Sequence, residues 1–236
     1  MTDNHGDRLD ALEEALGYRF RDREILERAL RHGSSVMSDL AGTYQRLEFL
    51  GDAILGHATA LMLFERFPTD DQGALTRKRV HLVRSERLAE RAALLGLDGW
   101  VEVGFSVEKS GGRGSTGLLE DVFEAVVGAI AIDGGWDEAW AFVERQLGAE
   151  ADELDERTLA LADPKSALQE AAQARNLPLP VYRLLRAGGT DHHRLWTYAL
   201  DWDGEEIARG EGRSKRSAQQ RAARRALVRL GLVPEE

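Results

Sequence analysis

The chain lacks cysteine entirely among its 236 residues. This excludes disulfide scaffolds and thiolate metal sites, and it fits a reducing compartment. The N-terminal residues 1–7 are polar and acidic rather than an apolar signal segment. No stretch approaches an uninterrupted span of about 20 apolar residues. We therefore expect a soluble, cytoplasmic protein without a membrane partner, and 43% apolar residues suffice for one large or two ordinary domain cores.

The chain also lacks an excess of positive charge, since 31 Lys and Arg residues stand against 41 Asp and Glu residues and the formal net charge is −10. That balance argues against a nucleic-acid partner, but the charge is distributed unevenly. From Asp163 to the end there are 13 Lys and Arg residues against 10 Asp and Glu. Between Arg209 and Arg229 the basic residues number eight and the only acid is Glu211. A basic stripe on a small C-terminal domain is typical of polyanion binding, although charge alone also fits a solvated helix face.

What the chain does contain is a long apolar segment interrupted by acids, which begins at residues 46–55, RLEFLGDAIL. Glu48 and Asp52 are four residues apart, so they share one face of a helix. The apolar residues around them predict a core helix over about 45–67. A buried carboxylate is costly unless it is paired or bound to a metal, so this helix requires a compensating partner.

A second apolar helix, predicted over 118–133, repeats the pattern with Asp121 and Glu124 three residues apart. Gly51, Gly56 and Gly128 are expected to let the two helices approach closely. Further helices are predicted over 7–31, 74–95 and 136–148 from the 3.6-residue apolar period. No strand pattern precedes Gly148, so the N-terminal domain is expected to be all-α.

The glycine-rich segment 109–117, KSGGRGSTG, leads directly into the second apolar helix. Glycine-rich loops before helices suit phosphate groups, because backbone N–H groups and the helix dipole face the anion. A flexible linker explains the same composition. The segment is not a Walker loop, because the Gly-Lys-Ser/Thr spacing is missing.

Four carboxylates therefore stand on two apolar helices: Glu48, Asp52, Asp121 and Glu124. Each could be a solvated side chain or an ion-pair partner, but two same-face pairs on apolar helices favour a shared cation. Oxygen ligands without Cys, and without a nearby pair of His ligands, indicate a hard cation, Mg²⁺ or Mn²⁺. Such a site usually serves phosphate chemistry.

The last 70 or so residues change character after the acidic, alanine-rich segment 151–162, which we interpret as a helical or flexible linker. Asp163 and Pro164 predict a helix start, with an N-cap followed by proline at the first position. Strands are predicted over 181–186, 194–202 and 206–210, with a hairpin turn at Asp203-Gly204. Ser214 is expected to cap a final helix to about Leu230. The predicted order is α-β-β-β-α.

These motifs together resemble a known family. Residues 46–55 resemble the signature of ribonuclease III, and residues 121–125, preceded by the loop at 111–113, match its second motif. The C-terminal order resembles the double-stranded RNA-binding domain, which reads the shape of A-form duplexes. The resemblance implies two domains: an all-α ribonuclease III endonuclease and dimerisation domain over 1–150, the linker 151–162, and an α+β RNA-binding domain over 163–232.

The resemblance also implies an activity, the Mg²⁺-dependent endonucleolytic hydrolysis of double-stranded RNA. Glu48, Asp52, Asp121 and Glu124 would bind Mg²⁺, with Mn²⁺ as a substitute, and Asp52 and Glu124 would be the catalytic pair. The family forms a symmetric homodimer that leaves 5′-phosphate ends and short 3′ overhangs on ribosomal RNA precursors and other structured RNAs. Phe49 would then be a dimer contact, although simple core packing explains it equally well.

In the binding domain the resemblance assigns RNA contacts to positions on the two helices and one loop, which are Gln169, Glu170, His192, Lys215, Arg216 and Gln219. Trp196 is expected in the core, and Trp202 in packing against the sheet. The chain departs from the family pattern at Tyr44 and Gln45, where the family usually has Asn-Glu, and at Gln72, where it has an acid. These departures affect secondary metal sites and cleavage-site preference rather than the reaction.

Two other function classes explain part of the sequence. A non-catalytic duplex-RNA-binding regulator would explain the C-terminal domain, but it predicts the loss of one of the four acids, and all four are present. A metal-dependent nucleotide pyrophosphohydrolase of the all-α type would explain carboxylates on helices but not the basic C-terminal domain.

Overall fold

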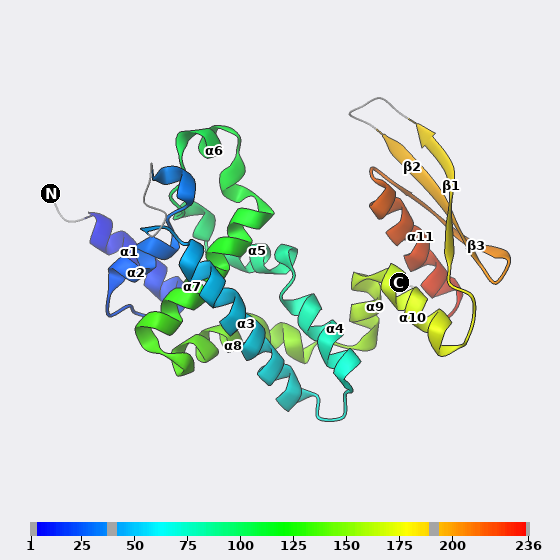
Figure 1. Cartoon of the computed structure of the whole chain (residues 1–236), viewed down its shortest axis with the longest axis horizontal. Coiled ribbons are helices and arrows are strands. Elements are labelled where there is room, and N and C mark those ends of the chain that lie inside the picture. Colours follow the sequence, from blue (N-terminus) through cyan, green and yellow to red (C-terminus); the bar gives the residue numbers. More distant parts are fainter. Residues whose placement is uncertain (1–3, 37–41, 189–193, 235–236) are drawn as a thin grey trace. The chain divides into compact units, whose positions relative to one another are not determined.

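The computed structural model describes residues 4–36, 42–188 and 194–234. The chain divides into two compact units, Met1–Glu153 and Leu154–Glu236. Figure 1 shows that the first is built from helices and the second from helices and a sheet. The predicted two-domain fold class is confirmed.

The helical unit contains α1 (Asn4–Leu16), α2 (Arg23–Ala29), α3 (Gln45–Arg66), α4 (Gln72–Leu82), α5 (Ser85–Leu94), α6 (Phe105–Lys109), α7 (Thr116–Gly134) and α8 (Trp136–Asp152). Short 3₁₀ segments lie at Gly33–Ser35, Leu97–Gly99 and Gly112–Gly114. The described residues of this unit hold no strand, only a single bridge between Arg31 and Glu102. Helix α7 supplies the centre of the core, since every residue from Val122 to Ile130 except Glu124 is buried.

Helices α3 and α7 cross in direct backbone contact near the middle of the unit (Figure 1). A Cβ atom on Gly51 would lie 1.8 Å from the Glu124 carbonyl oxygen, and one on Gly128 would lie 2.2 Å from the Leu47 carbonyl oxygen. Only glycine permits this approach at either position. The prediction is therefore confirmed for Gly51 and Gly128. It is wrong for Gly56, which has nothing within 4 Å of its Cβ position.

The single helix predicted over 74–95 is wrong, because the chain turns at Val83 and Arg84 and forms α4 and α5 instead. Arg84 is extended, with φ −71° and ψ 149°, and begins the next helix as its N-cap. The Ser85 hydroxyl donates a hydrogen bond of 2.9 Å to Glu120 on α7. The turn thereby lets α5 pack along α7, a tertiary contact that the helical period of this segment does not reveal.

The apolar sequence of α3 predicts a helix that is buried on all sides, but one side of α3 is exposed. Among the described helices it alone is long and apolar enough to cross a membrane. Its residues Leu47, Leu55 and Met62 nevertheless face the core of the helical unit. Core helices of globular proteins pass the same length test. The exposed side carries Phe49 and Phe64, which are 80% and 67% exposed.

The C-terminal unit contains α9 (Glu156–Ala162), α10 (Pro164–Ala174), β1 (Val181–Gly188), β2 (Leu195–Trp202), β3 (Glu205–Gly212) and α11 (Lys215–Arg229). The sheet is antiparallel in the order β1-β2-β3. Leu168 and Ala172 of α10 join Leu200 and Trp202 of β2 and the alanines of α11 in one core. Trp202 is buried as predicted and donates a hydrogen bond of 2.7 Å from Nε1 to the Pro178 carbonyl.

The starts and turns of this unit follow its local chemistry. Asp163 caps α10, with Pro164 at the first position, and Ser214 caps α11 by accepting from the Ser217 N–H. Asp203 and Gly204 both have positive φ, 52° and 82°, as a tight hairpin turn between β2 and β3 requires. Gly210 lets α11 lie against β3, since a Cβ there would be 2.1 Å from the Ala218 carbonyl oxygen.

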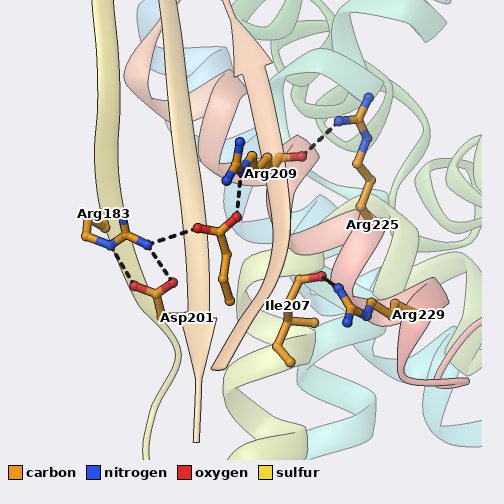
Figure 2. Close-up of polar contacts among 7 residues, drawn as sticks. Arg183, Asp201, Ile207, Arg209, Arg225 and Arg229 are labelled. Carbon is orange, nitrogen blue, oxygen red and sulfur yellow. Dashed lines mark hydrogen bonds and ion pairs between the residues drawn. The ribbon is translucent and has the colours of Figure 1, made fainter. Parts of the chain in front are cut away.

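Figure 2 shows how α11 covers the outer edge of β3. Arg225 donates to the Arg209 carbonyl at 2.9 Å, and Arg229 donates to the Ile207 carbonyl at 2.7 Å. Arg221 donates similarly to the Glu211 carbonyl. The three arginines are four residues apart along one side of the helix and satisfy alternate carbonyls of an edge strand. Unpaired edge carbonyls would otherwise be open to another strand.

Candidate active site and RNA-binding surface

The crossing of α3 and α7 brings together the four carboxylates that the sequence singles out. Because Gly51 packs on the Glu124 backbone, the turn that carries Glu48 and Asp52 faces the turn that carries Asp121 and Glu124. Glu48, Asp121 and Glu124 are half-buried, and Asp52 is exposed. The site is therefore open to solvent on the Asp52 side rather than enclosed in the core.

The acids at this crossing affect the pKa values of Glu124 and Glu48. Burial, followed by the neighbouring charges of Asp52, Glu120, Glu48 and Asp121, raises the pKa of Glu124 to about 8. Burial also raises the pKa of Glu48, with Asp121, Glu120 and Asp52 adding to the effect. Among the described residues no Lys or Arg forms an ion pair with any of the four. The cluster is a set of like charges without a compensating cation.

Two further side chains belong to this cluster that the sequence did not identify as part of it. The buried Tyr44 hydroxyl donates a hydrogen bond of 2.9 Å to Asp121 Oδ2, which fixes one carboxylate oxygen. Burial, followed by the charge of Asp121, raises the pKa of Tyr44. Glu120 adds a fifth acid beside Glu124 and accepts from Ser85. The only sequence signal for Tyr44 is that it departs from the family pattern.

The donor set fits a hard divalent cation, because all of its atoms are carboxylate oxygens. In the part of the chain that the structure describes, no group of three or more His, Asp or Glu side chains converges closely enough to hold a metal ion. Carboxylates repel one another, and a cation between them would offset this repulsion. The chemistry of the residues and their mutual repulsion, rather than a preformed coordination shell, support a metal site here.

The positions where the chain lacks the family's outer acids lie at the surface. Gln45 is exposed in the first turn of α3, one turn before Glu48, and Gln72 is exposed at the first position of α4. Neither side chain can carry charge. The turn of α3 that precedes Glu48 is accordingly less acidic at Gln45, and Gln72 lies beyond the opposite end of α3 from Glu48.

The predicted RNA-contacting residues lie on the two helices of the C-terminal unit. Gln169 and Glu170 are exposed on α10, and Lys215 and Arg216 are exposed at the first two positions of α11. Gln219 is half-buried one turn further along α11. His192 lies outside the described residues. Trp196 is half-buried rather than in the core, and the Lys215 ammonium lies 4.9 Å from the centre of its indole ring.

A lysine that the sequence did not single out joins α10 to α11. Lys165 Nζ donates to Gln219 Oε1 at 2.8 Å, and its backbone N–H donates to Gln220 Oε1 at 3.1 Å. Gln220 in turn donates to the Asp163 carboxylate at 2.9 Å. These bonds hold the N-terminal ends of the two helices side by side, so their exposed polar residues form one surface.

The exposed side of α3 forms a stripe beside the carboxylates. Phe49, Ala53 and His57 are four residues apart and exposed, and the stripe continues to Phe64. The Trp136 ring lies 4.8 Å from the His57 ring, which extends the stripe onto α8. Phe49 is 80% exposed, so core packing, the alternative explanation for this residue, is wrong.

Comparisons with known proteins agree with this arrangement. Residues 22–151 match the family model described as Ribonuclease-III-like, and residues 164–230 match the model described as Double-stranded RNA binding motif. The chain is 44% identical to a Ribonuclease 3 from Azorhizobium caulinodans over 227 residues, covering 95% of each chain. It is 41% identical to a Ribonuclease 3 from Solibacter usitatus, covering 93% of this chain and 86% of that one.

Solved structures resemble the helical unit. The nuclease domain of ribonuclease III from Campylobacter jejuni superposes with a TM-score of 0.58 at 32% identity, over 66% of this chain and all of that domain. A second structure of the same domain, whose description concerns flexibility in a region involved in dimer formation, gives a TM-score of 0.56 at 33% identity. It covers 59% of this chain and 99% of that one.

Proposed function

Because this chain belongs to the ribonuclease III family and is a metal-dependent endoribonuclease specific for double-stranded RNA, we propose that Mg²⁺ supports its reaction at the carboxylates of α3 and α7. The observation that carries the proposal is the uncompensated cluster of like charges at the crossing of the two helices. Mn²⁺ is expected to substitute, since it accepts the same oxygen ligands.

In this proposal Glu48, Asp52, Asp121 and Glu124 hold the ion, and Asp52 and Glu124 are the catalytic pair. A bound divalent ion would lower the pKa of a water and stabilise the leaving 3′ oxygen of the phosphodiester. Tyr44 keeps Asp121 in place by donating to one of its oxygens. Asp52 is the most exposed of the four, so it is the carboxylate that an incoming RNA backbone reaches first. The expected products carry 5′-phosphates and short 3′ overhangs.

We assign duplex recognition to the surface shared by α10 and α11. In this assignment Gln169 and Glu170 contact a minor groove. Lys215 and Arg216 contact phosphates at the start of α11, where the helix dipole also favours anions. His192 is assigned to the neighbouring groove on sequence grounds. Specificity for duplexes then follows from reading A-form shape rather than base edges.

We further propose a homodimer, formed through the exposed stripe on α3. Aromatic residues that stand this far out of a globular surface commonly mark an interface. The stripe adjoins Asp52, so two copies would place their carboxylate clusters on one assembly, one for each strand. A Phe49→Asp variant is expected to run as a monomer in light scattering after gel filtration, whereas a persistent dimer would contradict Phe49 as a contact.

The physiological setting is proposed from the same family membership. Precursors of ribosomal RNA and other structured RNAs are the expected substrates, and the absence of cysteine fits a cytoplasmic location. Both proposals can be tested in cells that lack the protein, by looking for unprocessed ribosomal RNA precursors and by locating the tagged chain.

The central experiment is the cleavage of a long RNA duplex by purified protein with Mg²⁺, with Mn²⁺ and with EDTA. Cleavage is expected with either ion and none with EDTA. Glu124→Gln is expected to reduce the rate by at least about 10³-fold while leaving the affinity for the duplex unchanged. Glu65→Gln, an exposed acid near the end of α3, is the matched control. Metal-dependent binding without cutting would instead favour the non-catalytic regulator.

A further inference from the structure

Two lysines of the C-terminal unit share an unusual environment. Lys215 Nζ lies 4.9 Å from the centre of the Trp196 ring, and Lys165 Nζ lies 4.8 Å from the centre of the Tyr182 ring. Both distances are within the range of a cation–π interaction, which restrains an ammonium group without neutralising its charge. Lys215 starts α11, and Lys165 lies in the first turn of α10.

Neither ammonium is paired with an acid. Within the described residues no carboxylate lies at ion-pair distance from Lys165 or Lys215, whereas Lys78 of the helical unit is paired with Asp70 at 2.7 Å. An ammonium has three donors. Lys165 uses one on Gln219 Oε1 and directs part of its charge to the Tyr182 ring, which leaves a donor for an external acceptor. Its side chain is half-buried, so the charge is fixed but still reachable.

Lys165 is also in the right place. It bonds to Gln219, which is one turn along α11 from the exposed Lys215 and Arg216. The Lys165 ammonium of α10 thus lies beside Gln219, an uncharged residue of α11. The surface that we assign to phosphates therefore continues across the junction of the two helices.

We propose that Lys165 is a further phosphate-contacting residue of the duplex-RNA surface, and that the rings of Trp196 and Tyr182 position Lys215 and Lys165 for this contact. The proposal rests on the RNA-binding role assigned above to Lys215 and Arg216. Holding the ammonium groups in advance lowers the entropy lost when they meet phosphates.

The test for Lys165 is the salt dependence of binding. The full chain is titrated with an RNA duplex of about 20 base pairs in EDTA, at several salt concentrations, so that binding is measured without cleavage. Lys165→Met keeps the aliphatic stem and removes the charge. We expect affinity to fall roughly 5- to 10-fold, and the slope of log K against log salt to decrease by about one unit, because one fewer phosphate contact releases counterions.

Arg183→Met is the matched control. It removes one positive charge from the same unit, but Arg183 is paired with Asp201 and Glu206 (Figure 2). Its neighbour on β1, Tyr182, packs against the core shared with α10 and α11, so Arg183 points to the opposite face of the sheet. Its salt slope is expected to equal that of the parent. Equal changes in both variants would mean a general charge effect and would overturn the proposal. An unchanged slope in Lys165→Met, with a reduced slope in Lys215→Met, would overturn it while leaving the proposed function intact.

The positioning role of Trp196 needs a measurement that a purely structural role would not change. Trp196→Leu is expected to weaken binding about threefold with an unaltered salt slope, and Trp196→Phe is expected to restore most of it. In a Lys215→Met background the Trp196→Leu change should have no further effect. The same loss in both backgrounds would show that Trp196 acts only through folding and would overturn its assigned role.

Discussion

The helical unit and the C-terminal unit both gather like charges, but of opposite sign. At the crossing of α3 and α7, four carboxylates and Glu120 face one another without a Lys or Arg partner among the described residues. At the junction of α10 and α11, no carboxylate among the described residues lies at ion-pair distance from Lys165 or Lys215. Elsewhere the same residue types are paired, as in Arg66 with Glu144 and Arg183 with Asp201.

The difference matches the ligand that we propose for each unit. A divalent cation would lower the repulsion within the acidic cluster, and a phosphate backbone would lower the repulsion within the basic surface. The means of holding the charges also differ. Carboxylates are placed by close backbone packing through glycine, whereas the two ammonium groups are placed by aromatic rings and an amide. Each of these differences can be tested separately.

The largest effect is expected from the packing that creates the acidic cluster. In Gly51→Ala the new Cβ would lie 1.8 Å from the Glu124 carbonyl oxygen, so α3 and α7 must separate. We expect the free energy of unfolding of the helical unit to fall by about 3 kcal/mol or more in chemical denaturation. Gly56→Ala, on the same helix with free space around it, should be neutral or more stable by up to about 1 kcal/mol. Similar losses in both would contradict the crossing geometry.

The next largest effect is the stabilisation of the helical unit, but not of the C-terminal unit, by Mg²⁺. Mg²⁺ at 100 times its dissociation constant should raise the free energy of unfolding of the helical unit by about 2.7 kcal/mol, because it binds only the folded cluster. Glu124→Gln should abolish this gain, and Glu65→Gln should not. A thermal shift series with Mg²⁺ and EDTA measures it. The C-terminal unit carries no such cluster among its described residues, so its transition should not respond to the metal.

A paired carboxylate should behave in the opposite way to Glu124. Burial alone would raise the pKa of Asp133, but hydrogen bonds from the Tyr18 hydroxyl at 2.6 Å and from the Arg21 and Asp22 backbone N–H groups hold it below its usual value. Because the folded-state pKa is lower than the unfolded one, this stability is present above about pH 4 and is lost as the pH falls through the folded value.

We therefore expect Asp133→Asn to lower the free energy of unfolding by about 1–2 kcal/mol at pH 7, because one oxygen acceptor is replaced by an NH₂ donor facing N–H groups. The difference from the parent should shrink as the pH falls below about 4, where the parent carboxylate itself becomes protonated. Denaturation curves at pH 7, 5 and 3 measure this. A difference that stays constant with pH would contradict the charged state of Asp133.

The smallest effect is expected from the arginines of α11, of which some stabilise the fold and others bind RNA. Arg225→Met removes the hydrogen bond to the Arg209 carbonyl on the edge of β3, so stability should fall by about 0.5–1 kcal/mol. Arg216→Met, at the exposed start of the helix, should leave stability unchanged and weaken RNA binding instead. The reverse pattern in denaturation and binding experiments would show that the basic surface lies along the β3 edge.

Local signals in the amino-acid sequence predict the structure of this chain correctly. Asp163 with Pro164, Ser214 and the Asp203-Gly204 turn each act within a few residues, and each lies at the predicted position. The 3.6-residue period likewise identifies α3 and α7, and the spacing of the acids places each pair on one helix face. These features depend on backbone conformations and cap hydrogen bonds that the nearby residues alone supply.

The tertiary structure decided what depends on contacts between distant segments. It set the turn at Arg84, the use of Gly51 and Gly128 but not Gly56, and the exposure of Asp52 and Phe49. Tyr44 reaches Asp121 across 77 positions of sequence, and Lys165 reaches Gln219 across 54. The residues next to Tyr44 or Lys165 in the sequence do not indicate these distant partners. The sequence alone therefore determined which charges this protein carries on which helices, and only packing decided which of them are left unpaired for a ligand.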